Sequence, residues 1–156
     1  MSERSERAGG GSPVGSADRA GGEQPPVGSI DWRFQPWSEL GRDDLYEILA
    51  ARSRVFVVEQ NCPYLDMDGH DAAAWHLWTG APVQAYLRVL PPGATFEEVS
   101  LGRIITAAEA RRGGLGKALV AEGLRRAESL FGKVPIRIAR SPLPSGTRQS
   151  PSVPAT

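Results

Sequence analysis

A run of cations and glycines, "ARRGGLGKAL" at residues 110–119, is the part of the sequence best suited to bind an anion. Its three closely spaced glycines allow a large group to approach the backbone. The apolar residues that follow have helical spacing, so the run would stand at a helix N-terminus, where free N–H groups and the helix dipole favour phosphate. Three side chains add positive charge: Arg111, Arg112 and Lys117.

Of three phosphate-binding motifs, one fits this run. A P-loop would need Gly where Arg111 stands, and Ser or Thr where Ala118 stands. A dinucleotide fingerprint starting at Gly114 would need Gly in place of Leu119. It would also need an acidic residue about twenty positions on, and "VPIRIARS" there contains none. The pattern Arg-x-x-Gly-x-Gly is satisfied by Arg111, Gly114 and Gly116.

The elements upstream of the run are predicted to be a helix, a loop and a hairpin. Helical spacing is followed by Leu45, Ile48, Leu49 and Arg52, and the next residues, "VFVVEQ", would either continue the helix or extend. Residues 61–71, "NCPYLDMDGHD", have the composition of a loop. Residues 74–79 alternate as in a strand, "TGAP" would turn the chain, and residues 83–90 would form the second strand.

The elements that would hold the run itself are a strand, a helix and a second strand. "FEEVSLGRIIT" is expected to be a strand ending at Thr106, and Gly132 is expected to stop the helix. "VPIRIA" then forms a short strand, which should pair in parallel with the earlier one. The apolar stripe of the helix consists of Leu119, Val120, Leu124, Ala127 and Phe131.

Two longer segments resemble a known enzyme family. "GRIITAAEARRGGLGKALVAEGLRRAE" resembles the acetyl-CoA-binding segment of the GNAT superfamily of N-acetyltransferases. "LYEILAARSRVFVVEQNCPYLDMDGHD" resembles the front half of its ElaA-type family. The resemblance covers roughly residues 32–138.

The resemblance implies an α/β (α+β) fold, in which a GNAT-like mixed β-sheet is flanked by helices. The sheet would splay open between its fourth and fifth strands, where the pantetheine arm of acetyl-CoA lies like an extra strand. Main-chain groups of Ile104, Ile105 and Thr106 would contact the pantetheine. The pyrophosphate would be held by Arg111, Arg112, Gly113, Gly114, Leu115, Gly116 and Lys117. Acetyl-CoA is then a cosubstrate, and no metal is expected.

The implied reaction is direct attack of an amine on the thioester, with no covalent enzyme intermediate. Such an enzyme must position the reactants, remove a proton and stabilise the oxyanion. The candidate catalytic carboxylates are Glu59, in "VVEQ", and Glu98, in "EEVSLGR". Taken singly, each is more often a solvated surface acid.

Other polar residues in the loop allow different interpretations. Cys62 could be a nucleophile partnered by His70 or His76, but a small half-buried cysteine is the commoner case. "DMDGHD" lacks the Gly and Glu positions of a calcium loop. Its acids could attract an amine substrate or simply be solvated: Asp66, Asp68 and Asp71. His76, within an apolar strand, is predicted to be a satisfied core residue.

The two ends of the chain differ in composition from its middle. Residues 1–28 contain no Leu, Ile, Phe, Tyr or Trp, so they are predicted to be a disordered leader. Residues 141–156 hold four prolines and four serines, with no acid and no aromatic, and are predicted to be a disordered tail. The folded domain is expected at residues 29–140.

The resemblance implies a further helix with a Phe-Tyr pair after "IRI", then a Gly-Phe turn and two strands. The tyrosine of that helix is the family's usual general acid, whereas Tyr46, Tyr64 and Tyr86 all lie upstream. We therefore expect a GNAT domain that lacks its last helix and strands, with a tail that is a candidate frameshift product and an activity that is weakened or absent. The alternatives are an inactive CoA-binding relative and an interaction domain that uses an exposed edge strand.

Bulk composition narrows the partners. The 156 residues carry 18 Lys and Arg against 18 Asp and Glu, and this balance gives no general attraction to nucleic acid or anionic membranes. No apolar run is long enough to span a bilayer, and one cysteine excludes an internal disulfide. These features predict a cytoplasmic protein. The resemblance implies acetyl-CoA and an amine as its partners, and a homodimer is possible.

Overall fold

The computed structural model describes residues 29–139, and its centre is a five-stranded sheet in the order β1-β2-β3-β4-β5. Neighbouring strands are antiparallel except β4 and β5, which are parallel. The sheet is therefore mixed, as expected. The strands are β1 (Arg33–Pro36), β2 (Trp75–Thr79), β3 (Ala85–Leu90), β4 (Val99–Thr106) and β5 (Ile136–Ile138).

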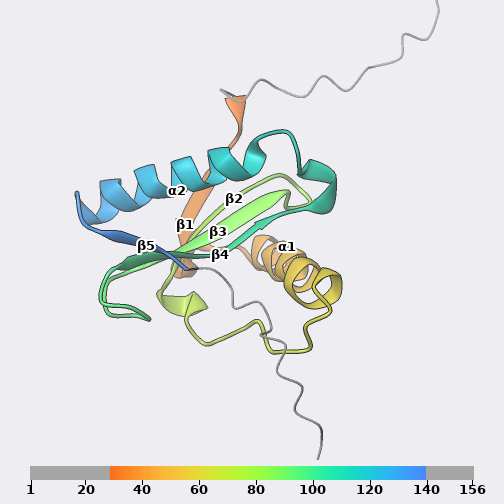
Figure 1. Ribbon diagram of the computed structural model, residues 1–156, viewed down its shortest axis with the longest axis horizontal. Helices are drawn as coiled ribbons and strands as arrows, with labels where there is room; N and C mark the ends of the chain where they lie inside the picture. Colours follow the sequence, from red (N-terminus) through yellow and green to blue (C-terminus); the bar gives the residue numbers. More distant parts are fainter. Residues whose placement is uncertain (1–28, 140–156) are drawn as a thin grey trace, which may run out of the picture.

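Two helices cover opposite faces of the sheet (Figure 1). One is α1 (Arg42–Ser53), which continues without a break into η3 (Arg54–Glu59), a wider π-helical turn. The other is α2 (Leu115–Phe131), which connects β4 to β5. Three short 3₁₀ turns complete the described part: η2 (Trp37–Glu39), η4 (Asp71–Ala73) and η5 (Ala108–Ala110).

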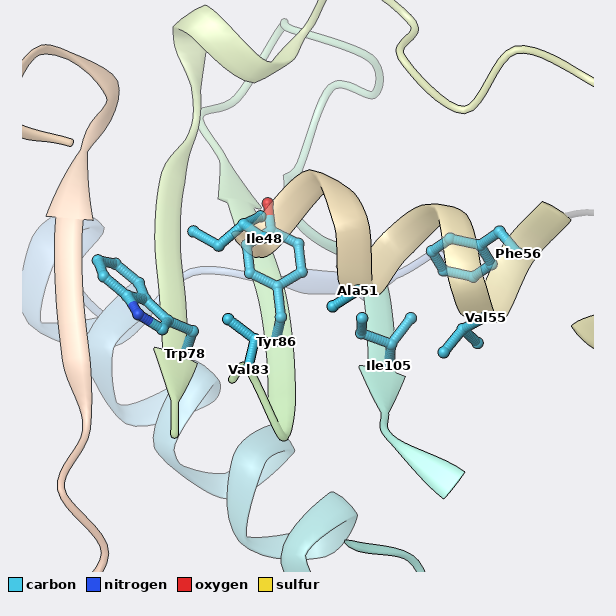
Figure 2. Packing of buried hydrophobic residues seen from close by; sticks show 8 residues of the cluster. All are labelled: Ile48, Ala51, Val55, Phe56, Trp78, Val83, Tyr86 and Ile105. Carbon is cyan, nitrogen blue, oxygen red and sulfur yellow. The ribbon is translucent and has the colours of Figure 1, made fainter. Parts of the chain in front are cut away.

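Each face of the sheet has its own apolar core, because side chains alternate along the strands. On the α1 side, Tyr86 and Trp78 pack against Ile48, Val55 and their neighbours (Figure 2). On the α2 side the buried cluster is Leu77, Ala85, Leu87, Val89, Val99, Leu101, Leu119 and Ala127. The helix lies close to the sheet there, since a Cβ on Gly123 would stand 2.7 Å from a Leu87 methyl.

Strand β4 contains a bulge near its middle. Tyr86 pairs with Ile105 but Arg88 pairs with Gly102, so Leu87 of β3 faces two residues of β4. Arg103, one of these two, has φ +52°, in the left-handed region. A bulge of this kind bends the strand and re-aims the side chains beside it.

Most elements agree with the sequence-based predictions. The mixed sheet with helices on both faces is confirmed, as are the hairpin, the end of β4 at Thr106, the stop of α2 at Gly132 (φ +80°) and the parallel pairing of β5. "VFVVEQ" continues the helix rather than extending. Strand β1 was not predicted. The proposed leader (1–28) and tail (141–156) lie outside the described residues, and the predicted domain is described to residue 139.

Candidate active site

The cation-glycine run forms the connection between β4 and α2. Its anion loop, defined here as residues 111–114, follows η5 and ends where α2 begins at Leu115. Arg112 (φ +74°) and Gly114 (φ +82°) are both left-handed, so the backbone turns sharply twice. The first helical bond runs from Ala118 N–H to Gly114 O, which leaves the N–H groups of the first turn available for a ligand.

The space in front of the loop is open. A Cβ on Gly114 would meet no atom within 4 Å, so a ligand could approach the backbone there. Gly116 has another role, because a Cβ would lie 3.2 Å from Thr106 Oγ1 and the first turn of α2 packs against the end of β4. A cavity of about 520 Å³ also opens beside the loop, with walls that include Asp31, Gly80 and Glu109.

Within the described residues, the pairing of β4 with β5 extends to Leu101. Their last paired residues are Leu101 and Ile138, followed by a bond from Ala139 N–H to Leu101 O, whereas β4 continues to Thr106. The β5-facing side of residues 102–106, called here the gap edge, has no partner strand among residues 29–139.

The register shows how Thr106 is oriented at the gap edge. The Ala107 N–H donates to Gln84 O, so these two residues form a hydrogen-bonded pair across β3 and β4. Pairs alternate in an antiparallel ladder, and Thr106 with Ala85 is therefore a pair without such bonds. It follows that the N–H and C=O of Thr106 point away from β3, towards the gap.

Arg111 spans the end of β4. Its Nε donates to Thr106 O at 2.9 Å, and its Nη2 donates to Glu59 Oε2 at 2.6 Å. The other two cations of the run, Arg112 and Lys117, make no ion pair with any residue the structure describes. The predicted cofactor residues 104–106 and 111–117 thus meet in one place, with Glu59 beside them.

Glu98 lies elsewhere. It directly precedes β4, about 26 Å of extended chain from Thr106, and accepts hydrogen bonds from Arg137 of β5 at 2.9 and 3.3 Å. These bonds lower the pKa of the Glu98 carboxyl. The two candidate carboxylates therefore stand at opposite ends of β4.

A buried charge cluster, which the sequence did not reveal, joins the loop before β2 to α1, β3 and the bulge of β4. Arg52 donates to Asp66 and Asp71, both at 2.8 Å, and Arg88 donates to Asp71 at 2.8 Å and to Asp68. The sixth member is Arg103. Its Nε lies 2.7 Å from an Asp66 oxygen, an ion pair that is not an aligned hydrogen bond, and its Nη2 bonds Asp68 at 3.1 Å.

The cluster lowers the pKa values of two of its carboxyl groups. Burial acts to raise the pKa values of Asp68 and Asp71, but hydrogen bonds from the arginines outweigh burial and lower both. Burial lowers the pKa of His76, which bonds Tyr86 Oη at 2.8 Å and Asp71 O at 3.0 Å. His76 is therefore a satisfied core residue, as predicted.

One interpretation of the loop residues needs correction, and another is confirmed. The three aspartates are not free to attract an amine, because arginines hold all of them, and Asp66 and Asp71 are buried while Asp68 is partly exposed. Cys62 is half-buried, as the commoner alternative had it, and within residues 29–139 neither His70 nor His76 bonds its thiol. The same residues contain no group of side chains suited to hold a metal ion and no helix that could cross a membrane.

Comparison with known proteins gives close relatives but no matching family model. A UPF0039 protein of Synechocystis is 34% identical over 113 residues, which are 70% of this chain and 73% of the relative. The ElaA protein of Escherichia coli is 38% identical over 99 residues, 61% of this chain and 65% of the relative. The chain thus spans about two thirds to three quarters of the length of these relatives.

Solved structures similar to this chain agree with the relatives found by sequence. A Pseudomonas aeruginosa acyl-CoA N-acyltransferase matches with TM-score 0.67 and 37% identity over 70% of this chain and 78% of the other. E. coli ElaA matches with TM-score 0.66 and 34% identity over 70% and 77%. A predicted acetyltransferase of Clostridium acetobutylicum, solved with acetyl-CoA, shares the fold at 13% identity, with TM-score 0.53 over 82% and 96%. The chain belongs to the ElaA-like (UPF0039) family and has the GNAT acyltransferase fold.

Proposed function

We propose that the protein transfers an acetyl group from acetyl-CoA to an amine by direct attack of the amine on the thioester. The observation that carries the proposal is the gap edge of β4, which has no partner strand within residues 29–139 and lies beside the anion loop. An extended amide chain that ends in phosphates suits this combination, because one part offers strand-like main-chain groups and the other a helix N-terminus. The C. acetobutylicum relative solved with acetyl-CoA supports the choice of ligand.

Acetyl-CoA would be held mainly by backbone. The N–H groups at the start of α2 would face the pyrophosphate, with Arg112 and Lys117 as the free cations, and residues 104–106 would meet the pantetheine. The acyl end would then point along β4 towards the bulge and the start of the strand. This orientation puts the amine at the Glu98 end and the phosphates at the Glu59 end.

The neutral amine nitrogen bonds the carbonyl carbon, the C–S bond breaks, and a proton lost from the nitrogen passes to the leaving thiolate. An amine that arrives as an ammonium first gives up a further proton to a base. Glu98 is proposed for this task, because it stands at the amine end. Glu98 is ionised at neutral pH, as a proton acceptor must be, although the hydrogen bonds from Arg137 lower its pKa and so weaken it as a base.

The experiment is a measurement of free CoA thiol released from acetyl-CoA with a panel of small amines and peptides. Amine-dependent release is expected from the wild-type protein, and Glu98→Gln should lower kcat roughly 100-fold or more. Glu97→Gln, a neighbouring acid outside the proposed site, is the matched control. Stabilisation by acetyl-CoA without release of thiol would instead favour the inactive CoA-binding alternative. If acetyl-CoA gives neither stabilisation nor release, the proposal is contradicted.

A further inference from the structure

Glu59 was a candidate base on the sequence alone, but its surroundings favour another role. It lies at the end of η3, which prolongs α1, and its carboxylate accepts a 2.6 Å hydrogen bond from Arg111, 52 positions further along the chain. Both side chains are partly exposed, at 28% for Glu59 and 44% for Arg111. The pair therefore links the helix on one face of the sheet to the loop at the head of the other helix.

Arg111 also contacts the end of β4, so its pair with Glu59 reaches the gap edge. Its Nε donates to Thr106 O, the carbonyl that the ladder register directs towards the gap. One guanidinium thus fixes three things together: the end of η3, the last residue of β4 and the start of the anion loop. A planar guanidinium with two of its donors engaged in different directions has little freedom to rotate.

We propose that Glu59 is a positioning residue for acetyl-CoA, acting through Arg111, and that it does not remove the proton. By holding Arg111, Glu59 fixes the left-handed turn of the loop and the gap edge of β4 before the ligand arrives. Preorganisation of this kind improves affinity because less ordering remains to be done on binding. The inference rests on the proposed function, since it concerns how the same site holds acetyl-CoA.

The charges around the loop are consistent with this division of roles. Glu59 balances the charge of Arg111, whereas Arg112 and Lys117 have no ion-pair partner within residues 29–139. The two unpaired cations remain to meet the phosphates. Glu59 also stands at the phosphate end of β4, on the opposite side of the bulge from Glu98.

A double-mutant cycle on acetyl-CoA affinity tests the inference. The Kd would be measured by calorimetry for the wild type, Glu59→Ala, Arg111→Ala and the double variant. If Glu59 acts through Arg111, each single change weakens binding about tenfold and the double variant is no weaker than either single one. If the affinity losses of the two single variants multiply in the double variant, the inference is overturned. Tighter binding of acetyl-CoA by Glu59→Ala would also overturn it, because it would mean that Glu59 competes with the ligand.

Turnover of Glu59→Gln separates positioning from proton removal. The amide keeps an acceptor oxygen for Arg111, so this variant should recover part of the lost affinity with kcat within about twofold of the wild type. If Glu59 were the general base, Glu59→Gln would lower kcat roughly 100-fold and remove one limb of the pH profile, with KM for acetyl-CoA unchanged. That outcome would also overturn the inference.

The matched control is the Glu122–Arg125 pair, which is a similar ion pair on α2 with a 2.7 Å contact and no contact to the loop. Glu122→Ala and Arg125→Ala should leave the Kd for acetyl-CoA unchanged. Thermal unfolding of every variant checks that it is folded. If the wild type does not bind acetyl-CoA, the proposed function and this inference both fail; if it binds and the cycle shows no coupling, only the inference fails.

Discussion

The arginines of the buried charge cluster and the cations of the anion loop differ in how completely the protein satisfies them. Arg52, Arg88 and Arg103 have side chains at most 13% exposed, and each bonds two aspartates. Arg111 of the loop has one acidic partner, whereas Arg112 of the loop and Lys117 of the first turn of α2 have none among the described residues. Residues of the same charge thus pair with buried acids in one region and are proposed to bind a ligand in the other.

The contrast teaches that the number of partners, more than the residue type, separates a structural cation from a binding one. Buried charges are tolerated only when they are paired and hydrogen-bonded, so the cluster must be complete. An exposed cation at a helix N-terminus adds little to stability, yet it can attract phosphate. Changes in the cluster should therefore alter stability, and changes in the loop should alter affinity.

The largest effect is expected for Arg52→Ala. The change leaves Asp66 and Asp71 buried without one of their hydrogen-bonding partners, and breaking a buried ion pair from one side typically costs about 3–5 kcal/mol. Urea unfolding measures the loss. The control Arg125→Ala, on the surface of α2, should stay within about 0.5 kcal/mol of the wild type. A loss below about 1 kcal/mol for Arg52→Ala would show that the cluster does not stabilise the fold.

A pH dependence should follow from the same cluster. Arginine hydrogen bonds hold the pKa of Asp68 below the value of about 3.9 that the unfolded chain has. Its stabilising contribution is therefore complete above pH 4 or so and is lost as the pH falls further. Urea unfolding at pH 7, 5 and 3 should give a smaller acid loss for Asp68→Asn than for the wild type. If the free energy of unfolding falls equally with pH in the wild type and in Asp68→Asn, the stabilising role given to ionised Asp68 is contradicted.

Arg112→Ala and Lys117→Ala should act on affinity alone. Each removes an unpaired cation, so the Kd for acetyl-CoA is expected to rise about tenfold, while the free energy of unfolding changes by less than about 0.5 kcal/mol. The difference from the wild type should shrink at high salt, because exposed charges are screened. Calorimetry at two salt concentrations measures this. Unchanged affinity would remove these side chains from the site.

A loss of stability smaller than that of Arg52→Ala is expected for Gly114→Ala. A Cβ there would meet no atom, so the cost is that of a left-handed backbone at φ +82°, about 1–2 kcal/mol. Gly113 does not have a positive φ, and Gly113→Ala is the stability control. Equal stability of the two variants would show that the loop is free to change its conformation.

The sequence predicted those parts of the structure that depend on local spacing. The stripe of α2, its stop at Gly132 and the anion loop all follow from residues within one or two turns of each other. Strand β1 was not predicted, because "RFQP" is only four residues long, ends in proline and shows no alternation. Its place in the sheet comes from pairing with β2, more than 35 residues away.

The buried charge cluster could not be predicted from local spacing either, because its pairs are 14 to 37 positions apart. A usable signal was present, however. Arg88 and Arg103 each stand inside an otherwise apolar strand, where a charge needs a buried partner, and three aspartates occupy one short loop. A count of the charges that a strand would have to bury indicates that these arginines pair with the loop aspartates. It does not indicate which arginine pairs with which aspartate.

Hydrogen exchange with and without acetyl-CoA tests the central claim most directly, because it reports on the backbone groups that are proposed to hold the ligand. The account predicts slower exchange on ligand addition at residues 104–106 and 111–117, with little change in β1 and β2. No protection at these residues, in a protein that binds acetyl-CoA, would contradict the claim that the gap edge and the anion loop form the binding site.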